Sequence, residues 1–434
     1  MRPMPPADKA LVKLGQKLFF DPLLGGNKDV ACATCHHPDF GSSDGRRLSI
    51  GTGGTGLGSD RRLGPGRRLT ARHSPDLFER ARPEWRVLFW DGRLQKGEDK
   101  QWRALSPQAV RIPLPSPRRT GASPLATTVQ SWLPPLARVE MRGQVQHAPA
   151  GLIADRAWDG SENELAAMGN DDLVGVWRAL RQRILAIPAY RQAFTELSQQ
   201  NDPSPAAENL ADVAGFMQLA GMAISAFMQE AFRADKTPWD RFLAGDDTVL
   251  SQAQMRGALL FYGDAGCARC HRGALFSDQK FHHIGVVPYA AALIPGSQQD
   301  LGRFLISRRV ADRYAFRTPP LRNVALTAPY FHNGSVATLQ DAIWQHVSPR
   351  QQWTRFNWQG LPWEIRSISH PELVNREKFL QTLAPALSSA QGLSQAQVDD
   401  LQAFLNALTD PRGREIRAWI PASVPSGLPV PRLD

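Results

Sequence analysis

The chain has 434 residues, of which 42% are hydrophobic and 21% are charged, and its formal net charge is +10. This length and hydrophobic content predict a globular protein of two or three domains and exclude an intrinsically disordered chain. No run of about 18 apolar residues occurs, which excludes a membrane-spanning helix.

The first predicted element is a short helix over residues 11–20. Its apolar residues recur at helical spacing, and Asp21-Pro22 ends the pattern. A Cys-x-x-Cys-His segment follows at 32–36, and then a glycine-rich segment at 51–58. Because no strand precedes the glycines and no Gly-Lys-Ser/Thr follows them, we interpret them as a flexible loop rather than a phosphate cradle.

Helical periodicity is strong from residue 174 onward. Residues 174–197 and 208–232 are predicted to be two long helices whose methionine and phenylalanine stripes belong to the core. Residues 233–247 are predicted to join two domains. We place the domains at 1–235 and 236–434.

The second domain repeats the order of the first. Ser251-x-x-Gln254 is a capping-box pattern that opens a helix leading to a second Cys-x-x-Cys-His segment at 267–271. A loop region leads to a helix predicted over residues 338–347. Another capping box, Ser394-x-x-Gln397, opens the last predicted helix, which ends near Leu408.

Cys-x-x-Cys-His is the attachment pattern of a c-type haem, in which two thiols bind the porphyrin and the histidine binds the iron. The two segments use all four cysteines, which leaves none for a disulfide. One zinc ion held by four cysteines is the alternative, but it leaves both trailing histidines without a role. We predict a mainly α protein with two cytochrome c-like helical domains, each carrying one covalent haem. The predicted haem-binding residues are Cys32, Cys35, His36, Cys267, Cys270 and His271.

The haem prediction also bears on compartment and charge. Cytochrome c maturation takes place outside the cytoplasm, whereas residues 1–6 lack the apolar core of a secretory signal. We therefore expect a periplasmic protein whose signal has been removed, with Met1 added or retained. The arginines between residues 46 and 72 indicate a solvated face or partners for haem propionates. An acidic protein partner is the alternative, and we expect no nucleic acid.

The ordered motifs resemble those of the bacterial di-haem cytochrome c peroxidases and their MauG-like relatives. The resemblance covers most of the chain. It rests on the two haem segments and on further matches that include Leu14-Gly15-x-x-Leu18-Phe19-Phe20-Asp21-Pro22, Phe89-Trp90-Asp91-Gly92-Arg93, Arg317-Thr318-Pro319-Pro320 and Pro329-Tyr330-Phe331-His332-Asn333-Gly334. It implies a peroxide-reactive first haem and a six-coordinate second haem.

In the family, a histidine sixteen residues after the first haem histidine caps that iron, and here this position is Thr52. A threonine hydroxyl is a poor iron ligand, so the resemblance implies an open first haem, as in the MauG-like branch. The family's distal ligand of the second haem falls at His346, and no methionine follows Met255. Ligation by His271 and His346 without a methionine favours oxidised iron, which can store an oxidising equivalent.

The resemblance also assigns the catalytic groups. Glu140 matches the distal glutamate that moves a proton between the peroxide oxygens, and Gln130 and Pro134 match its neighbours. Trp90 matches the tryptophan between the two haems, where it relays electrons or packs the interface. Arg93 and Arg303 are interpreted as structural residues or propionate partners.

The family binds calcium between its domains through an asparagine side chain and carbonyls near Thr327 and Pro329. The asparagine position is His73 here. Because calcium prefers oxygen ligands, this replacement weighs against the side-chain ligand and leaves carbonyls and water as candidate ligands.

Three functions remain open from the sequence. The first is a MauG-like enzyme in which hydrogen peroxide forms a high-valent iron state that both haems share and that oxidises a partner protein, with modification of Trp or Tyr as one outcome. The second is a periplasmic cytochrome c peroxidase that removes hydrogen peroxide with electrons from a small donor protein. The third is an electron-transfer di-haem cytochrome. Thr52 and Glu140 argue against a plain electron carrier.

Overall fold

The computed structural model describes residues 4–65, 67, 69–98, 102–105, 157, 160–161, 163–165, 172–201, 212–289, 299–390 and 392–433. Within these ranges the protein is mainly helical, as predicted. The helices before residue 235 are α1 (Lys9–Phe20), α2 (Cys32–Cys35), α4 (Leu173–Leu185), α5 (Pro188–Asn201) and α7 (Val213–Ala231). Those after it are α8 (Pro238–Leu243), α9 (Gln252–Tyr262), α10 (Phe304–Ser307), α11 (Leu339–Val347), α12 (Pro349–Arg355), α13 (Trp363–Arg366), α14 (Arg376–Gln381) and α15 (Gln395–Asn406).

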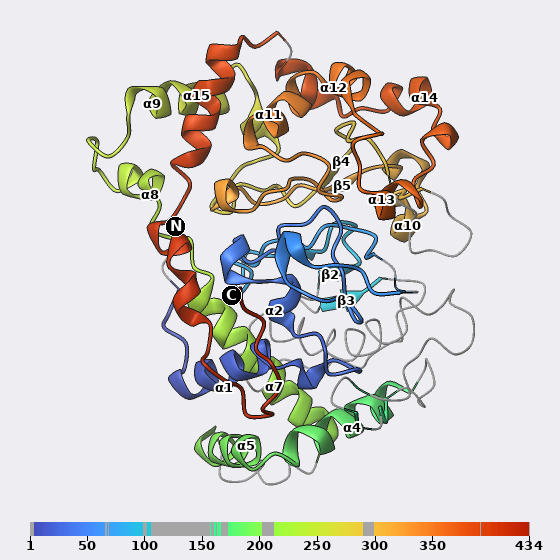
Figure 1. Cartoon of the computed structure of the whole chain (residues 1–434). Coiled ribbons are helices and arrows are strands. Elements are labelled where there is room, and N and C mark those ends of the chain that lie inside the picture. The colour runs from blue at the N-terminus through green and yellow to red at the C-terminus, as the bar shows by residue number, and fades with distance from the viewer. Residues whose placement is uncertain are drawn as a thin grey trace.

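The described strands are short and form two antiparallel sheets near the middle of the molecule (Figure 1). The first sheet has the order β1 (Val87–Leu88), β2 (Leu94–Lys96), β3 (Trp102–Ala104). The second pairs β4 (Phe281–His282) with β5 (Phe316–Arg317), in the register Phe281 to Arg317. These strands mainly fix loops beside the boundary between the two halves.

In the first half, α1 crosses α7 at a glycine. The Asp8 carboxylate caps α1 by accepting hydrogen bonds from the Ala10 and Leu11 amides, both at 2.9 Å. A Cβ at Gly15 would lie 1.9 Å from the Ala223 carbonyl oxygen, so the two backbones approach too closely for any side chain there. This crossing anchors the helix that leads into the first haem segment.

The second half also contains two helices that cross at a glycine. Ser251 and Ser394 form the predicted capping boxes of α9 and α15. A Cβ at Gly257 of α9 would lie 1.9 Å from the carbonyl oxygen of Asp400 in α15. The two helices lie side by side at the top of Figure 1. Each half therefore has one helix pair, crossed at a glycine, next to its Cys-x-x-Cys-His segment.

Two sequence-based boundaries differ from the structure. The helix predicted over 174–197 is two helices, α4 and α5, because Pro188 cannot donate a backbone hydrogen bond to a continuing helix. The stretch 233–247, predicted as a joint, contains α8. Trp239 of α8 is buried in the second hydrophobic core, so part of this stretch belongs to the second half.

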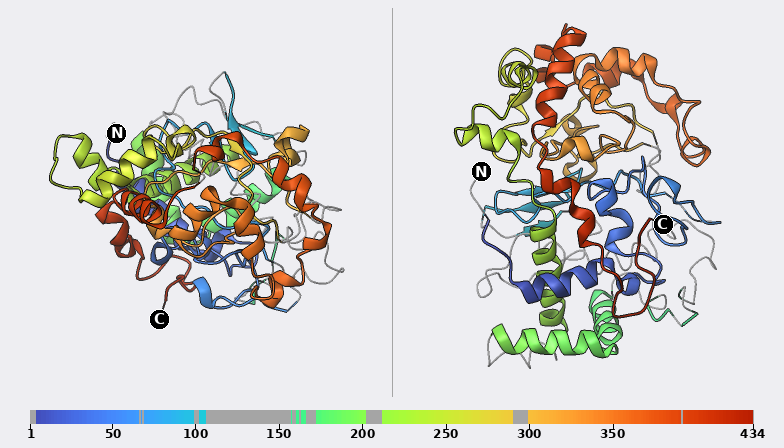
Figure 2. Two further views of the ribbon diagram at one scale, coloured as in Figure 1. Left: turned by 90° about the horizontal axis from the view of Figure 1, so that it is seen from above. Right: turned by 60° about the vertical axis from the view of Figure 1, so that its left-hand side comes forward.

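The two largest hydrophobic cores separate near residue 235. The first core contains α1, α4 and α7, and the second contains α9, α11 and α15. After α15 the chain returns to the first half, where Ile416 and Val424 are buried in the first core. Figures 1 and 2 show this segment running down from α15 past α1 and α7. The C-terminal segment thus ties the second half to the first.

Candidate haem sites

The first Cys-x-x-Cys-His segment forms the one-turn helix α2, and His36 follows it directly. Nδ1 of His36 lies 3.0 Å from the Ser42 carbonyl oxygen and 3.2 Å from Ser74 Oγ. A carbonyl only accepts, so Nδ1 carries the ring hydrogen and Nε2 keeps its lone pair. Burial lowers the pKa of His36, which favours the neutral ring that a metal needs. The ring is thus prepared to bind a metal through Nε2.

Thr52, the position of the family's capping histidine, is fixed by a polar network. Its hydroxyl donates to the Asp29 carboxylate, with oxygen distances of 2.8 and 2.9 Å, and accepts from Asn27 Nδ2 at 2.6 Å. The side chain is buried, with 1% of the residue exposed. Its hydroxyl is therefore already bonded and is not free to bind a metal.

No second histidine lies in ring contact with His36 within the part of the chain that the structure describes. The neighbouring His37 is turned toward the C-terminal segment, where its Nε2 lies 3.1 Å from the Pro431 carbonyl oxygen. Its Nδ1 accepts from the Asp39 amide at 3.2 Å. Both ring nitrogens of His37 are thus bonded away from the His36 ring.

The second segment differs because its histidine faces another one. His271 follows the 3-10 turn Cys267–Arg269, and its Nδ1 lies 3.1 Å from the Phe276 carbonyl oxygen. His346 lies on α11, and its Nδ1 lies 2.8 Å from the Ala342 carbonyl oxygen. The two ring centres are 6.2 Å apart, and the ring planes meet at 69°. Each ring therefore has its Nε2 free of these carbonyl bonds.

This separation fits two imidazoles that bind one metal ion from opposite sides. An imidazole nitrogen lies about 2 Å from a bound metal and about 1 Å from its own ring centre, which predicts ring centres about 6 Å apart. Burial, followed by the neighbouring His346, lowers the pKa of His271 to about 4, and burial lowers that of His346. Both rings are neutral near pH 7, and their carbonyl bonds fix the tautomer and orientation that a metal ligand requires. The spacing and the neutral state of His271 and His346 therefore fit two ligands of one haem iron.

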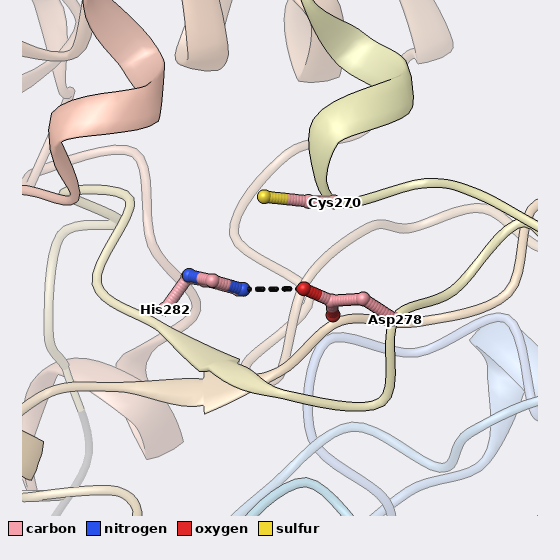
Figure 3. A group of neighbouring side chains, drawn as sticks. All are labelled: Cys270, Asp278 and His282. Carbon is pink, nitrogen blue, oxygen red and sulfur yellow. Dashed lines mark hydrogen bonds and ion pairs between the residues drawn. The ribbon is translucent and has the colours of Figure 1, made fainter.

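All four cysteines are half-buried, and none of them is in a disulfide. Cys270 also lies in a group with Asp278 and His282 whose donor atoms fall within 4.8 Å of one another (Figure 3). His282 Nε2 lies 2.9 Å from the Asp278 carboxylate, which raises the pKa of His282 to about 9. A protonated imidazole is a poor metal ligand, and haem attachment would consume the Cys270 thiol. His282 therefore forms an ion pair with Asp278, and the haem attachment of Cys270 remains a prediction.

Trp90 lies where the two halves meet. Its indole Nε1 donates to the His73 carbonyl at 2.9 Å, and its own carbonyl accepts from the Arg317 amide at 2.8 Å. The residue is 9% exposed. Trp90 is therefore held by the first half through its side chain and by the second half through its backbone.

A buried ion-pair network closes the same interface. Arg72 donates from Nε and Nη2 to the Asp300 carboxylate at 2.6 and 2.7 Å, and from Nη1 to Asp91 at 2.6 Å. Burial raises the pKa of Asp300, but Arg72 outweighs it and holds the value below the usual range. Arg303 Nη1 donates to the Asp91 and Gly92 carbonyls, both at 3.0 Å. The Arg72–Asp300 pair links the halves across 228 residues of sequence, and the Arg303–Asp91 bond does so across 212.

The other predicted site residues are placed as follows. Glu140, Gln130 and Pro134 lie outside the described residues, so their catalytic assignment remains a prediction. Arg93 Nε donates to the Asp91 carboxylate at 3.1 Å, which is the structural role expected of it. Arg303, described above, likewise supports the interface.

Thr327 and Pro329, the predicted calcium carbonyl region, are half-buried in the second half. The Thr327 hydroxyl donates to the Val324 carbonyl at 3.1 Å. His73 stands in the first half, at the interface.

Several positioning groups could not be found from the sequence. The carbonyls of Ser42 and Phe276 orient the two proximal histidines, but any residue carries such an acceptor. Ser74 and Asp29 act through contacts between segments distant in sequence. Both carbonyls belong to residues with positive φ, 61° at Ser42 and 52° at Phe276, a conformation that a serine or a phenylalanine does not predict.

The helical fold and the carbonyl-oriented histidines after two Cys-x-x-Cys pairs define a protein of the c-type cytochrome class. The particular family follows from sequence comparison. A profile of the di-haem cytochrome c peroxidases matches residues 9–248, more than half of the chain, and a RoxA-like, cytochrome c-like profile matches residues 315–354. The chain belongs to the di-haem cytochrome c peroxidase family and is an oxidoreductase of the peroxidase type.

Relatives of both branches are similar to the chain. The methylamine utilization protein MauG of Methylorubrum extorquens is 27% identical over 86% of this chain and 77% of its own. The cytochrome c551 peroxidase of Pseudomonas aeruginosa is 29% identical over 76% of this chain and 70% of its own. The names of the relatives therefore do not separate the MauG-like function from the peroxidase function.

Solved structures share the fold. A MauG-like protein associated with microbial copper homeostasis matches 94% of both chains with a TM-score of 0.56 and 23% identity. The di-haem peroxidase BthA of Burkholderia thailandensis matches 94% of this chain and 87% of its own with a TM-score of 0.54 and 21% identity. In the described part of this chain, no helix has both the length and the hydropathy to cross a membrane.

Proposed function

We propose that this protein is a periplasmic di-haem oxidoreductase that uses hydrogen peroxide to oxidise a partner protein. The difference between the two histidine sites carries the proposal. The His346 and His271 rings are separated by the distance expected for two ligands of one metal ion, whereas the Thr52 hydroxyl is bonded to Asp29 and Asn27. His271 and His346 would together hold one haem, and a haem held by His36 would be accessible to peroxide without prior activation.

The bound haems would supply the redox chemistry, and the chain's residues would control it. His36, oriented by the Ser42 carbonyl, would hold the iron of the first haem. Glu140 accepts a proton from peroxide and returns it to the leaving oxygen, with Gln130 and Pro134 shaping its surroundings. Trp90, on the boundary between the halves, relays electrons.

The second site supports storage of oxidising equivalents. Two neutral imidazoles without a methionine lower the reduction potential of a haem relative to His/Met ligation. His271 and His346 are both buried and fixed by backbone carbonyls. Such a site is better suited to hold oxidised iron than to collect electrons from a high-potential donor.

The second candidate is a cytochrome c peroxidase that detoxifies hydrogen peroxide with electrons from a small donor protein. The similarity to the cytochrome c551 peroxidase favours it. The basic surface would suit an acidic partner in either case, because the formal net charge is +10.

Reaction of the diferric protein with one equivalent of hydrogen peroxide, without reductant, separates the two. The proposal predicts that the absorption of both haems changes at once and that the change decays faster when the substrate protein is added. A protein co-encoded with this one is the first substrate to test, with mass spectrometry of its Trp and Tyr residues. A requirement for prior one-electron reduction would contradict the proposal and support the detoxifying peroxidase.

A further inference from the structure

Three consecutive residues, Arg72-His73-Ser74, join the open haem site to the second half, and we refer to them as the strap. Arg72 forms the ion pairs with Asp91 and Asp300. Ser74 Oγ donates to the Cys35 carbonyl at 2.7 Å and lies 3.2 Å from His36 Nδ1. The strap therefore contacts both the domain boundary and the histidine of the first haem segment.

His73, the middle residue, bonds through both of its ring nitrogens. Nδ1 lies 2.7 Å from the Arg46 carbonyl oxygen and so donates to it, and Nε2 lies 3.2 Å from Ser43 Oγ. Only 5% of the residue is exposed. Burial lowers the pKa of His73, although Asp44 acts in the opposite direction. Because Nδ1 donates, Nε2 of the neutral ring can only accept. The Ser43 hydroxyl donates mainly to the Ser74 carbonyl at 2.7 Å, so the Nε2 contact is the weaker of the two ring contacts.

The backbone of His73 bridges the two halves. Its amide donates to the His332 carbonyl at 2.8 Å, and its carbonyl accepts from the Trp90 indole at 2.9 Å. The His332 ring in turn stacks on Phe316, with ring centres 3.5 Å apart. A shift of His73 would therefore move Trp90 relative to the second half.

The side chains at this position do not fit calcium. Calcium takes six to eight oxygen ligands, usually including carboxylates. The His73 side chain offers only nitrogen, and both nitrogens are bonded. Among the described residues, the one group of three His, Cys, Asp or Glu side chains with metal-binding spacing is the group around Cys270, and His73 is not in it. The Thr327 hydroxyl is bonded to its own turn.

We propose that His73 replaces a divalent cation at the domain boundary, so that the protein binds no calcium there and the imidazole positions Trp90 and Ser74. Three hydrogen bonds and the weaker Nε2 contact with Ser43 connect His73 to the loop of Ser43 and Arg46, to Trp90, and to the second half. The inference that the ion is absent does not depend on the proposed substrate. The link to Trp90 rests on the proposed function.

The test uses the full-length, haem-loaded protein and three readouts that need no peroxide: calcium content, unfolding temperature and the resting EPR signal of the His36 haem. After dialysis against EGTA, the wild-type protein should contain no stoichiometric calcium. Added calcium chloride should change neither its unfolding temperature nor its EPR signal. One calcium ion retained per chain, or an unfolding temperature that rises by several degrees with calcium, would overturn the proposal.

The variant His73→Asn, kept in EGTA, tests the positioning role. Loss of the ring bonds should lower the unfolding temperature by about 2–5 °C and shift the EPR signal of the His36 haem, because Ser74 moves with His73. The variant His73→Gln carries the same amide as Asn one methylene further from the backbone, closer to the Nε2 partner Ser43, and should restore part of both. An unchanged unfolding temperature and EPR signal in His73→Asn would contradict the proposal.

Two further variants keep the result interpretable. His283→Asn alters another buried histidine, whose Nδ1 lies 3.0 Å from Thr382 Oγ1, far in sequence from the strap. It should leave the EPR signal of the His36 haem unchanged. If His73→Asn does not fold, Ser43→Ala removes the Nε2 contact together with the hydrogen bond from Ser43 Oγ to the Ser74 carbonyl at 2.7 Å, and it should cause the same shifts at smaller size. No shift in Ser43→Ala would count against the proposal.

Discussion

The two Cys-x-x-Cys-His segments hold their histidines alike but set different partners against them. In both, a backbone carbonyl binds Nδ1 and burial favours the neutral ring. His271 then faces His346, whereas the family's capping position in the first half is Thr52, which is bonded to Asp29. The same local motif therefore gives one candidate six-coordinate site and one candidate open site, and residues far from the motif decide which.

The largest expected effect comes from a substitution that should impair the His36 haem site and leave the second site intact. Glu140→Gln should slow oxidation of the diferric protein by peroxide about 10²–10⁴-fold, the usual contribution of a positioned acid–base group. An amide can donate a hydrogen bond but cannot shuttle the proton. Stopped-flow mixing with peroxide measures the rate. Both resting haem spectra should survive, and a rate within about threefold of the parent would remove Glu140 from the mechanism.

The next largest effect concerns the buried Arg72 ion-pair network between the two halves. Arg72→Leu should lower the free energy of unfolding by about 3–5 kcal/mol, because it leaves the Asp91 and Asp300 carboxylates buried without their shared partner. Chemical denaturation followed by haem absorption measures the change. Arg256→Leu is the matched control, since Arg256 is exposed in its pair with Asp400 and its loss should change stability far less. Equal losses in the two variants would show that the Arg72 network is not a stabilising joint.

Removal of the second imidazole should make the second site resemble the first. His346→Gly should convert the second haem from low-spin to high-spin while peroxide still reacts at the His36 haem. Magnetic circular dichroism of the resting protein reports the spin states. A second haem that stays low-spin would mean that another residue is the ligand, despite the 6.2 Å separation of the rings.

The smallest change tests communication between the sites. Trp90→Phe keeps an aromatic ring but loses the hydrogen bond to the His73 carbonyl. We expect a loss of stability of about 1 kcal/mol and slower electron exchange between the haems. Flash photolysis of the half-reduced protein measures that exchange. An unchanged exchange rate would leave Trp90 with a packing role only.

Local patterns in the sequence predicted local structure well. The helix ending at Phe20 and the helices opened by Ser251 and Ser394 occur as expected, because their caps and apolar spacing act over a few residues. Pro188 was the missed local signal, since it divides a stretch that otherwise has continuous helical spacing. The return of Ile416 to the first core had no local signal.

The candidate sites were predictable to a similar degree. The haem segments and His346 follow from motif and register, and the structure places His346 against His271. The bonds that fix Thr52 and His73 depend on Asp29, Asn27 and Ser43, whose contacts arise only from tertiary folding. No sequence pattern encodes contacts of this kind. The sequence alone could identify Thr52 as the position that lacks a capping histidine, but it could not predict the hydrogen bonds that hold the Thr52 hydroxyl.

The most direct test of this account is low-temperature EPR of the resting diferric protein before any peroxide is added. The account predicts one high-spin signal from the His36 haem and one low-spin signal from the haem held by His271 and His346. Two low-spin signals would contradict it, because the first haem would then carry a sixth ligand that closes it to peroxide.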